Sequence, residues 1–308
     1  MKIKRTTFLK SLLFGFTLMF IFILSTGCSG NNTSSNNIPP IQEQFPYSSD
    51  DPITEAILFE EGLITTEELN EWSFNFSWDG TELYIQKGTI GDSQIYVSYF
   101  KDNKWTTPVL SMFSNEDKSS FEDGPFISPD GKKFFFASNR SGGLSPNKYD
   151  LWTADKTEDG WGEPYHLGDI INSESEEWLP SVAMNGNLYF ASNRPSEHGS
   201  NGQTDIYVSK LVNGQYSDPE LLTFNTPAFE QSPFIAPDES YLIFTRGQEI
   251  YISYNEDGSW SKGEKIPVEI SDGIKYSPYV SPDKKYFFYT TNGDIKQIET
   301  SVLDLRID

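Results

Sequence analysis

The segment PFISPDG at residues 125–131 recurs four more times, with changes, along the chain. The other copies are FNFSWDG (74–80), PSVAMNG (180–186), PFIAPDE (233–239) and PYVSPDK (278–284). The sixth position of each copy holds Asp79, Asp130, Asn185, Asp238 or Asp283, at intervals of 51, 55, 53 and 45 residues. A repeat of this length indicates that the chain folds as a series of similar structural units.

Each copy is followed by further short segments rich in aromatic and β-branched residues. In the second repeat they are KFFFAS (133–138), DLWTA (150–154) and a segment that opens with WGEP (161–164). Such segments, bounded by turn residues, predict four short β-strands per repeat. Pairs such as Asp130-Gly131 favour tight hairpin turns, because the central residues of these turns adopt positive φ. Calcium loops and sialidase-type Asp boxes also contain Asp and Gly, but neither pattern is complete here, so we interpret the pairs as turns.

Four strands repeated every 45 to 55 residues predict an all-β fold, a β-propeller of four-stranded blades. The repeat count gives five blades, and six would require a further blade within residues 31–70. The fifth repeat ends after its third strand, whereas residues 56–65 hold strand-like segments that have no partner. We therefore predict that this N-terminal segment supplies the last strand of the fifth blade and closes the ring. The predicted propeller domain is 51–308.

The N-terminal residues have the features of a targeting segment. A basic start is followed by an uncharged, mostly apolar run at 11–24, which predicts a signal peptide over 1–27. The sequence LSTGC (24–28) resembles a bacterial lipobox, with Ser25 where a leucine is usual. The resemblance implies lipid attachment at Cys28 and a protein anchored to a bacterial membrane outside the cytoplasm, the alternative being an uncleaved signal anchor. Residues 28–50 are rich in Ser, Asn and Pro, which predicts a flexible tether.

Composition excludes several classes of function. The chain has 308 residues with 23 Lys and Arg against 45 Asp and Glu, a net charge of -22. Such a surface repels nucleic acid, and we expect membrane contact only through the N-terminal lipid. The single cysteine excludes an internal disulfide, and two histidines are too few for a His-rich zinc site. The sequence also lacks a G-x-S-x-G nucleophile elbow and a P-loop.

The segment SPDGKKFFFASNR (128–140) resembles the propeller repeat of the TolB-like family, and SNR recurs at 192–194. The WGEP segment fits the same pattern. Departures are Met184-Asn185 in place of Pro-Asp, Trp78 in place of Pro, and the missing glycine after Asp238 and Asp283. The resemblance implies a propeller of the cell envelope, often a lipoprotein, that serves as a binding scaffold, usually for proteins. A fold by itself does not determine function.

Charged residues recur at matching places in the repeats. The acids are Glu71, Glu122, Glu177 and Glu230, with Lys275 in the fifth repeat. The bases are Lys87, Arg140, Arg194 and Arg246, with Asn292 in the fifth repeat. Propeller geometry places both sets on one face, so we expect a ring of acids beside a ring of bases at one mouth of the central channel. Three interpretations remain open: salt bridges between blades, a ligand or Ca²⁺ site, and a glycosidase-like pair of catalytic carboxylates.

The long loops 138–150 and 192–205 lie on the same predicted face, where recognition usually occurs. Trp178 is either an exposed platform for a sugar or peptide, or part of the packing. From these features we predict a binding module for a protein or glycan partner. The alternative is a carbohydrate-active enzyme, which needs two unpaired carboxylates with perturbed pKa values at the channel mouth. We assign no catalytic residue, and no cofactor other than the Ca²⁺ considered above.

Overall fold

The computed structural model describes residues 45–47, 49, 51–89, 92–197, 203–267 and 273–307. The predicted signal peptide (1–27), Cys28 and most of the predicted tether (28–50) lie outside the described residues. Within the described part of the chain, no helix is both long and apolar enough to cross a membrane.

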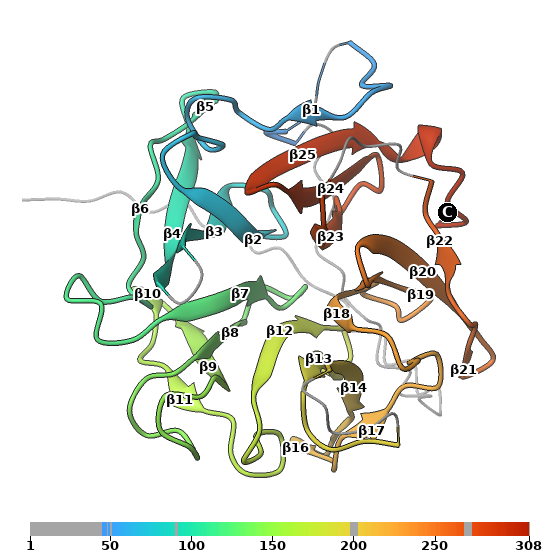
Figure 1. Cartoon of the computed structure of the whole chain (residues 1–308). Helices are drawn as coiled ribbons and strands as arrows, with labels where there is room; N and C mark the ends of the chain where they lie inside the picture. Colours follow the sequence, from blue (N-terminus) through green and yellow to red (C-terminus); the bar gives the residue numbers. More distant parts are fainter. Residues whose placement is uncertain are drawn as a thin grey trace, which may run out of the picture. The chain divides into compact units, whose positions relative to one another are not determined.

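Five small antiparallel sheets are arranged in a ring, each with its first strand nearest the centre (Figure 1). The first strands are β2 (Asn70–Phe76), β7 (Glu122–Ile127), β12 (Glu177–Val182), β18 (Glu230–Ile235) and β23 (Lys275–Val280). The second strands are β3 (Glu82–Thr89), β8 (Lys133–Ser138), β13 (Leu188–Ser192), β19 (Tyr241–Arg246) and β24 (Tyr286–Thr291). The third strands are β4 (Asp92–Lys101), β9 (Asp150–Thr157), β14 (Asp205–Ser209), β20 (Glu249–Glu256) and β25 (Asp294–Glu299). The chain is therefore a five-bladed β-propeller, as the repeat count predicts.

The outer strand of the first four blades is divided into two short pieces. The far pieces are β5 (Lys104–Trp105), β10 (Gly160–Trp161), β16 (Gln215–Tyr216) and β21 (Ser259–Trp260), and β16 pairs with β15 (Leu211–Val212), which continues the third strand of its blade. The near pieces are β6 (Val109–Leu110), β11 (Tyr165–His166), β17 (Glu220–Leu221) and β22 (Glu264–Lys265). In the second blade Pro164 lies between the two pieces, and a proline cannot donate to the ladder.

The N-terminal strand closes the ring. β1 (Ile57–Leu58) pairs antiparallel with β25, and Ile57 lies opposite Gln297. The fifth blade thereby gains its fourth strand from a segment that precedes the first blade, as predicted. This pairing joins the two ends of the ring and covers a sheet edge that would otherwise be open. A short 3-10 helix, η1 (Thr300–Val302), follows β25.

Aromatic side chains fill the interfaces between blades. Phe113 stacks on Phe134 at 4.0 Å between ring centroids in the cluster between the first and second blades. Phe224 and Phe244 make the corresponding stack at 4.5 Å between the third and fourth blades. Trp161, at the start of the WGEP segment, donates a hydrogen bond from Nε1 to the Tyr84 hydroxyl of the preceding blade, 2.9 Å away. The repeated aromatic residues thus hold neighbouring blades together.

The turns between first and second strands have the predicted form. Gly131 adopts φ +69°, and the Asp130 carboxylate accepts hydrogen bonds from the Ser128 hydroxyl and the Lys132 amide. Where the glycine is missing, Glu239 and Lys284 adopt the same left-handed conformation at φ +59°. The aspartates therefore stabilise their own turns. We call this side of the propeller the turn face, and the opposite side, where the first strands begin, the loop face.

Packing onto the propeller begins before the predicted domain boundary at residue 51. Phe45 and Tyr47 are buried, and the Tyr47 ring packs on Phe76 and Phe288 from the first and fifth blades. Gln297 donates a hydrogen bond from its side-chain amide to the Tyr47 carbonyl at 2.8 Å. This part of the predicted tether is therefore docked, because its aromatic side chains fill space beside the Asp79-Gly80 turn, where Phe45 contacts Gly80.

Candidate functional site

The predicted acids and bases form four ion pairs inside the blades. The pairs are Glu71–Lys87 at 2.9 Å, Glu122–Arg140 at 3.2 Å, Glu177–Arg194 at 2.9 Å and Glu230–Arg246 at 2.7 Å. All four glutamates are 0% exposed. The predicted acids and bases thus do lie beside each other and pair, but the glutamates are buried inside the blades rather than placed at the channel mouth. These four pairs are not the predicted salt bridges between blades, because both partners of each pair belong to one blade.

The bases of these pairs nevertheless connect neighbouring blades through the backbone. Arg140 donates to the Phe113 carbonyl and Arg194 donates to the Ile171 carbonyl, both at 2.5 Å. Both carbonyls belong to the segment that arrives from the preceding blade. Each cation thus neutralises a buried carboxylate and holds the connection between two blades, which explains why the pair recurs.

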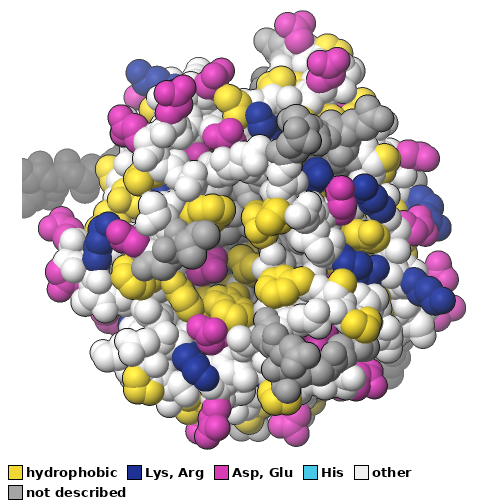
Figure 2. Space-filling view, in the orientation of Figure 1, with side chains coloured by type: hydrophobic (Ala, Val, Ile, Leu, Met, Phe, Trp, Pro, Cys, Tyr) yellow, Lys and Arg dark blue, Asp and Glu magenta, His cyan; other side chains and the backbone are white. Residues whose placement is uncertain are grey.

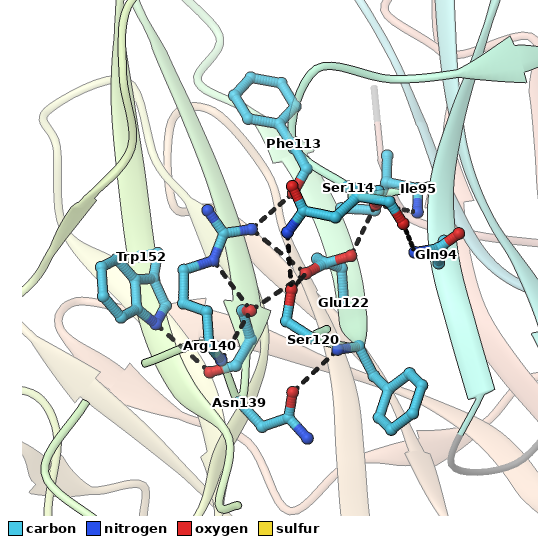
Figure 3. A network of polar contacts seen from close by, with 12 residues as sticks. Gln94, Ile95, Phe113, Ser114, Ser120, Glu122, Asn139, Arg140 and Trp152 are labelled. Carbon is cyan, nitrogen blue, oxygen red and sulfur yellow. Dashed lines mark hydrogen bonds and ion pairs between the residues drawn. The ribbon is translucent and has the colours of Figure 1, made fainter. Parts of the chain in front are cut away.

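The SNR motif belongs to the same arrangement (Figure 3). Ser138 donates from its hydroxyl to the Glu122 carboxylate at 3.2 Å and accepts a hydrogen bond from Arg140 Nε at 3.0 Å. Asn139 accepts a hydrogen bond from the Phe121 amide at 2.8 Å. The hydroxyls of Ser114 and Ser120 both donate to Glu122 at 2.6 Å. With these partners, the oxygens of this carboxylate are engaged by the protein itself.

The fifth blade departs from the pattern. Lys275 does not pair with a residue of its own blade but with Glu249 of the fourth blade, at 2.8 Å. Thr291 takes the position opposite Lys275 in the ladder. This ion pair does join two blades, which the other four do not.

Burial affects the acids of the pairs unequally. Burial raises the pKa of Glu71 to about 7, although the Lys87 ammonium acts in the opposite direction. The pKa of Glu230 is also raised by burial, against the effect of the Thr226 hydroxyl and the Arg246 guanidinium. Since their cations stay beside them, we assign these glutamates a structural role. Among the described residues no group of three or more His, Cys, Asp and Glu side chains is placed to hold a metal ion, so the Ca²⁺ expectation has no supporting donor cluster.

The residue after each of these positions faces the central channel instead. The five residues at this position are Trp72, Asp123, Trp178, Gln231 and Tyr276; each is half-buried, and Trp178 is the exception that packs at the rim. Four of them, all except Trp178, line a hollow of about 370 Å³ at the centre of the loop face, together with Tyr149, Gln86 and Ser93. Figure 2 shows this face, with apolar side chains bordering a central depression.

A β-bulge in each first strand gives the hollow its shape. In the second blade the register shifts between Asp123 and Phe126, and Gly124 adopts φ +58°. Leu179, Ser232 and Ser277 adopt the same left-handed conformation at the equivalent positions of the next three blades. Each of these residues precedes a proline, which has no backbone N–H to donate to the hydrogen-bond ladder. A bulge re-aims the side chain beside it, here into the hollow.

Below the hollow the channel narrows to a space too small for a sugar ring. About 30 Å³ lies among Pro125, Pro180, Pro233 and Pro278, which come from four different blades. A separate cavity of about 150 Å³ opens at the turn face. The hollow is therefore a closed-ended pocket, in which a ligand meets polar and aromatic groups on the walls and a tight floor.

Asp123 is the one acidic residue among the described residues that line the hollow. Burial raises its pKa to about 7, and no Lys or Arg lines the hollow to offset this effect in the described part of the chain. Beside it, Gln86 donates to the Ser93 hydroxyl and Ser93 donates to the Glu122 carbonyl, both at 3.0 Å. The wall near Asp123 is thus held in place by hydrogen bonds between the first and second blades.

Trp178 takes part in packing at the rim. Its ring lies 6.5 Å from that of Tyr149, and it packs on the main hydrophobic core. It is half-buried and lies beside the hollow rather than among its lining residues. Tyr149, which precedes β9, is the aromatic residue that reaches the hollow from the second blade.

A larger groove of about 690 Å³ lies on the turn face between the second and third blades. Tyr165, His166 and Tyr216 contribute to its walls. Two of its charged side chains are paired, Lys133 with Asp155 and His166 with Asp150 at 3.1 Å. Its Asp169 is exposed to solvent, whereas Asp123 in the hollow is half-buried with no Lys or Arg in the described lining, so we consider the hollow the stronger candidate site.

The predicted site residues lie one position before the residues that line the hollow. The residue type that repeats from blade to blade is the buried glutamate, and it marked the wrong position. The signal that could have found the hollow is strand alternation, because the residue after a buried one points to the other face of the sheet. Three of the five residues at that position are aromatic and the other two are Asp and Gln, so no repeated residue type marks the position.

Fold and site together define a five-bladed propeller with a closed-ended hollow at one face. No protein-family model matches the chain, and no curated protein matches it. Several solved structures are similar to it. A protein of unknown function from Dyadobacter fermentans is 14% identical, with a TM-score of 0.50 over 82% of this chain and 84% of that one.

Two other solved structures have names that indicate different roles. A protein from Agrobacterium tumefaciens assigned as TolB is 19% identical, with a TM-score of 0.48 over 77% of this chain and 79% of that one. A thermostable family-43 glycoside hydrolase is 12% identical, with a TM-score of 0.49 over 75% and 88%. At these identities and TM-scores, neither name is carried over to this chain.

Proposed function

We propose that the chain is a binding module that takes a carbohydrate into the hollow of the loop face. The observation that carries this proposal is the lining of the hollow, where Trp72, Tyr149 and Tyr276 lie among Gln86, Gln231 and Ser93. Aromatic faces pack against the C–H groups of a sugar ring, while amides and hydroxyls bond to its hydroxyl groups. A volume of about 370 Å³ lies within the usual range for small-ligand sites.

A protein partner fits this hollow less well. Stable protein interfaces bury roughly 800 Å² on each partner, largely over open surfaces. The hollow is concave and closed at its floor, which suits the end or a short stretch of a glycan. A protein partner remains the expected outcome if no glycan binds.

Hydrolysis has less support than binding. Burial places the pKa of Asp123 at about 7, in the range of a general acid. Glycoside hydrolysis, however, needs two carboxyl groups beside the scissile bond. Asp123 is the one acid of the lining within the described residues, and Glu122 and Glu177 are paired with arginines. Binding therefore accounts for the site without a second carboxylate.

A thermal-shift screen of the full-length protein in detergent tests the proposal. The probes are trisaccharides of glucose, xylose, mannose, N-acetylglucosamine and glucosamine. We expect at least one to raise the Tm, and we expect Trp72→Ala to abolish that rise. Tyr165→Ala is the matched control, because Tyr165 is an exposed aromatic residue on the opposite face. If no trisaccharide raises the Tm, or if Trp72→Ala leaves the rise intact, the hollow is not a carbohydrate site.

We further propose that the protein is held at a bacterial membrane by a lipid on Cys28. The basis is the lipobox-like segment LSTGC (24–28) and the Ser/Asn/Pro-rich stretch that follows it. Two or three acyl chains are sufficient for stable anchoring. Phe45 and Tyr47 meet the propeller at the turn face, opposite the hollow. Incorporation of radiolabelled palmitate in a bacterial host tests this, and Cys28→Ser should abolish it. Labelling that persists in the variant would contradict the proposal.

A further inference from the structure

We infer that the ligand of the hollow carries a protonated amine, so that the preferred carbohydrate is an amino sugar without an N-acetyl group. This inference rests on the proposed carbohydrate-binding function and specifies its ligand. It stands on the placement of one carboxylate among aromatic rings in a pocket whose described lining has no base.

Charge is the first argument. The described lining of the hollow contains Asp123 and neither Lys nor Arg. The internal segments outside the described residues, 90–91, 198–202 and 268–272, contain no Lys or Arg in their sequence either. The whole chain carries a net charge of -22, which raises the local concentration of cations and repels anions. A cationic group is therefore the complement that this pocket lacks.

The aromatic rings are the second argument. Trp72 and Tyr276, from the first and fifth blades, lie edge to face with 6.5 Å between their centroids. Tyr149 reaches the hollow from the second blade, which also carries Asp123. The faces of Trp and Tyr rings attract cations, and aromatic side chains beside a carboxylate are a recurring way to bind an ammonium group. The same rings can pack on the sugar that carries the amine.

The protonation state of Asp123 supports the geometry. Burial raises the pKa of Asp123 to about 7. A bound ammonium group favours the ionised carboxylate and brings this pKa down. The other titratable groups that face the hollow are Tyr149 and Tyr276, and burial raises the pKa of both phenols, so they stay neutral. Glu122, on the same strand, points away from the hollow and is held by Arg140.

Asp123 therefore controls how binding depends on pH. Lowering the pH from 7 to 5 keeps the amine protonated, whereas it protonates the Asp123 carboxyl. This change should weaken the binding of an amine. A neutral sugar has no charge to lose, so its affinity should change little.

Isothermal titration calorimetry on the full-length protein in detergent tests the inference. The probes are the trisaccharide of glucosamine and the trisaccharide of N-acetylglucosamine. At pH 7 we expect the first to bind at least tenfold more tightly than the second. Asp123→Asn should remove this difference, and lowering the pH to 5 should weaken glucosamine binding at least fivefold. Triglycine with a free amino terminus is the control for an amine without a sugar.

The outcomes separate this inference from the proposed function. Equal binding of both trisaccharides, lost in Trp72→Ala and unchanged in Asp123→Asn, would overturn the amine preference and leave the carbohydrate site in place. Binding of neither trisaccharide would remove the amino-sugar assignment. If no trisaccharide in the thermal-shift screen bound either, the proposed function would fail as well. Tighter binding of triglycine than of either trisaccharide would overturn the amino-sugar assignment and show that the hollow prefers the amine of a peptide.

Discussion

The buried ion pairs and the central hollow lie one residue apart on the same strands, yet they differ in almost every physical respect. At the first position four glutamates are fully buried and paired with cations. At the next position Trp72, Asp123, Gln231 and Tyr276 are half-buried and line the hollow, and Trp178 is half-buried at its rim. The first set is uniform, and the second changes its chemistry from blade to blade.

The difference separates two kinds of requirement. A uniform set is needed where each blade must meet the next in the same way, as Arg140 and Arg194 do through the carbonyls of Phe113 and Ile171. A ligand has no five-fold symmetry, so a pocket that recognises one must have different groups on its walls. In a repeat protein, residues that repeat therefore indicate packing, and residues that do not repeat at an inward-facing position indicate a site.

The largest expected effect comes from removing the cation of a buried pair. Arg140→Ala leaves the Glu122 carboxylate fully buried without its cation and frees the Phe113 carbonyl. We expect a loss of about 3–5 kcal/mol in the free energy of unfolding, the usual cost of an uncompensated buried charge. Urea denaturation at pH 7 measures it. Lys133→Ala is the control, because its pair with Asp155 is exposed and should contribute less than about 1 kcal/mol. Equal losses in both variants would remove the distinction between packing and surface pairs.

A smaller effect is expected at the bulge that shapes the hollow. A Cβ on Gly124 would lie 2.8 Å from Leu179 Cα in the next blade, and Gly124 has φ +58°. We expect Gly124→Ala to destabilise the protein by about 2–3 kcal/mol, since it adds a backbone clash to an unfavourable conformation. Gly131 also has positive φ but no atom within 4 Å of its Cβ position. Gly131→Ala should therefore lose only about 1 kcal/mol in the same urea experiment. A larger loss at Gly131 than at Gly124 would argue against close contact of these blades.

The smallest effect concerns the charge of the hollow and has the opposite sign. The pKa of Asp123 rises on folding from an ordinary value to about 7, so the native state binds more protons than the unfolded state between pH 4 and 7. The free energy of unfolding is therefore higher at low pH, where the Asp123 carboxyl is protonated, and falls as the pH rises through 7 and the carboxyl ionises. Asp123→Asn should leave stability unchanged at pH 4 and raise it at pH 8. Because Asp123 is half-buried and solvent screens its charge, we expect about 1–2 kcal/mol.

The measurement is urea denaturation of both proteins at pH 4, 6 and 8. Gln231→Ala is the control, since it alters the same hollow without changing charge, and its effect should be about the same at each pH. Ser73→Ala is less suitable, because the Ser73 hydroxyl donates a hydrogen bond to the Gln86 side chain. A stability gain in Asp123→Asn that is equal at all three pH values would show that Asp123 does not titrate in this range.

Much of the fold could be predicted because it depends on local patterns that repeat. Asp130-Gly131 indicates a turn, KFFFAS (133–138) indicates a strand, and their recurrence gives the number of blades. Closure of the ring followed from the unpaired segment near Ile57 and the incomplete last repeat, and the pairing of β1 with β25 confirms it. The docking of Phe45 and Tyr47 could not be predicted, because no repeat contains an equivalent segment.

The candidate site could be predicted only in part. The sequence placed Glu122 and Arg140 near each other correctly, since both lie at the same end of adjacent strands. It did not show which side of the strand each residue faces, and a shift of one residue moves a side chain from the blade interior to the channel. The bulge at Gly124 alters this alternation further.

The sequence by itself therefore determined the architecture: five blades, their strands and turns, and the closure by an N-terminal strand. These depend on short-range patterns that each repeat states again. Only the tertiary structure decided that the glutamates are internal supports and that Trp72, Asp123, Gln231 and Tyr276 meet in one hollow. The physical reason is that these four residues come from four blades and become neighbours only when the ring closes.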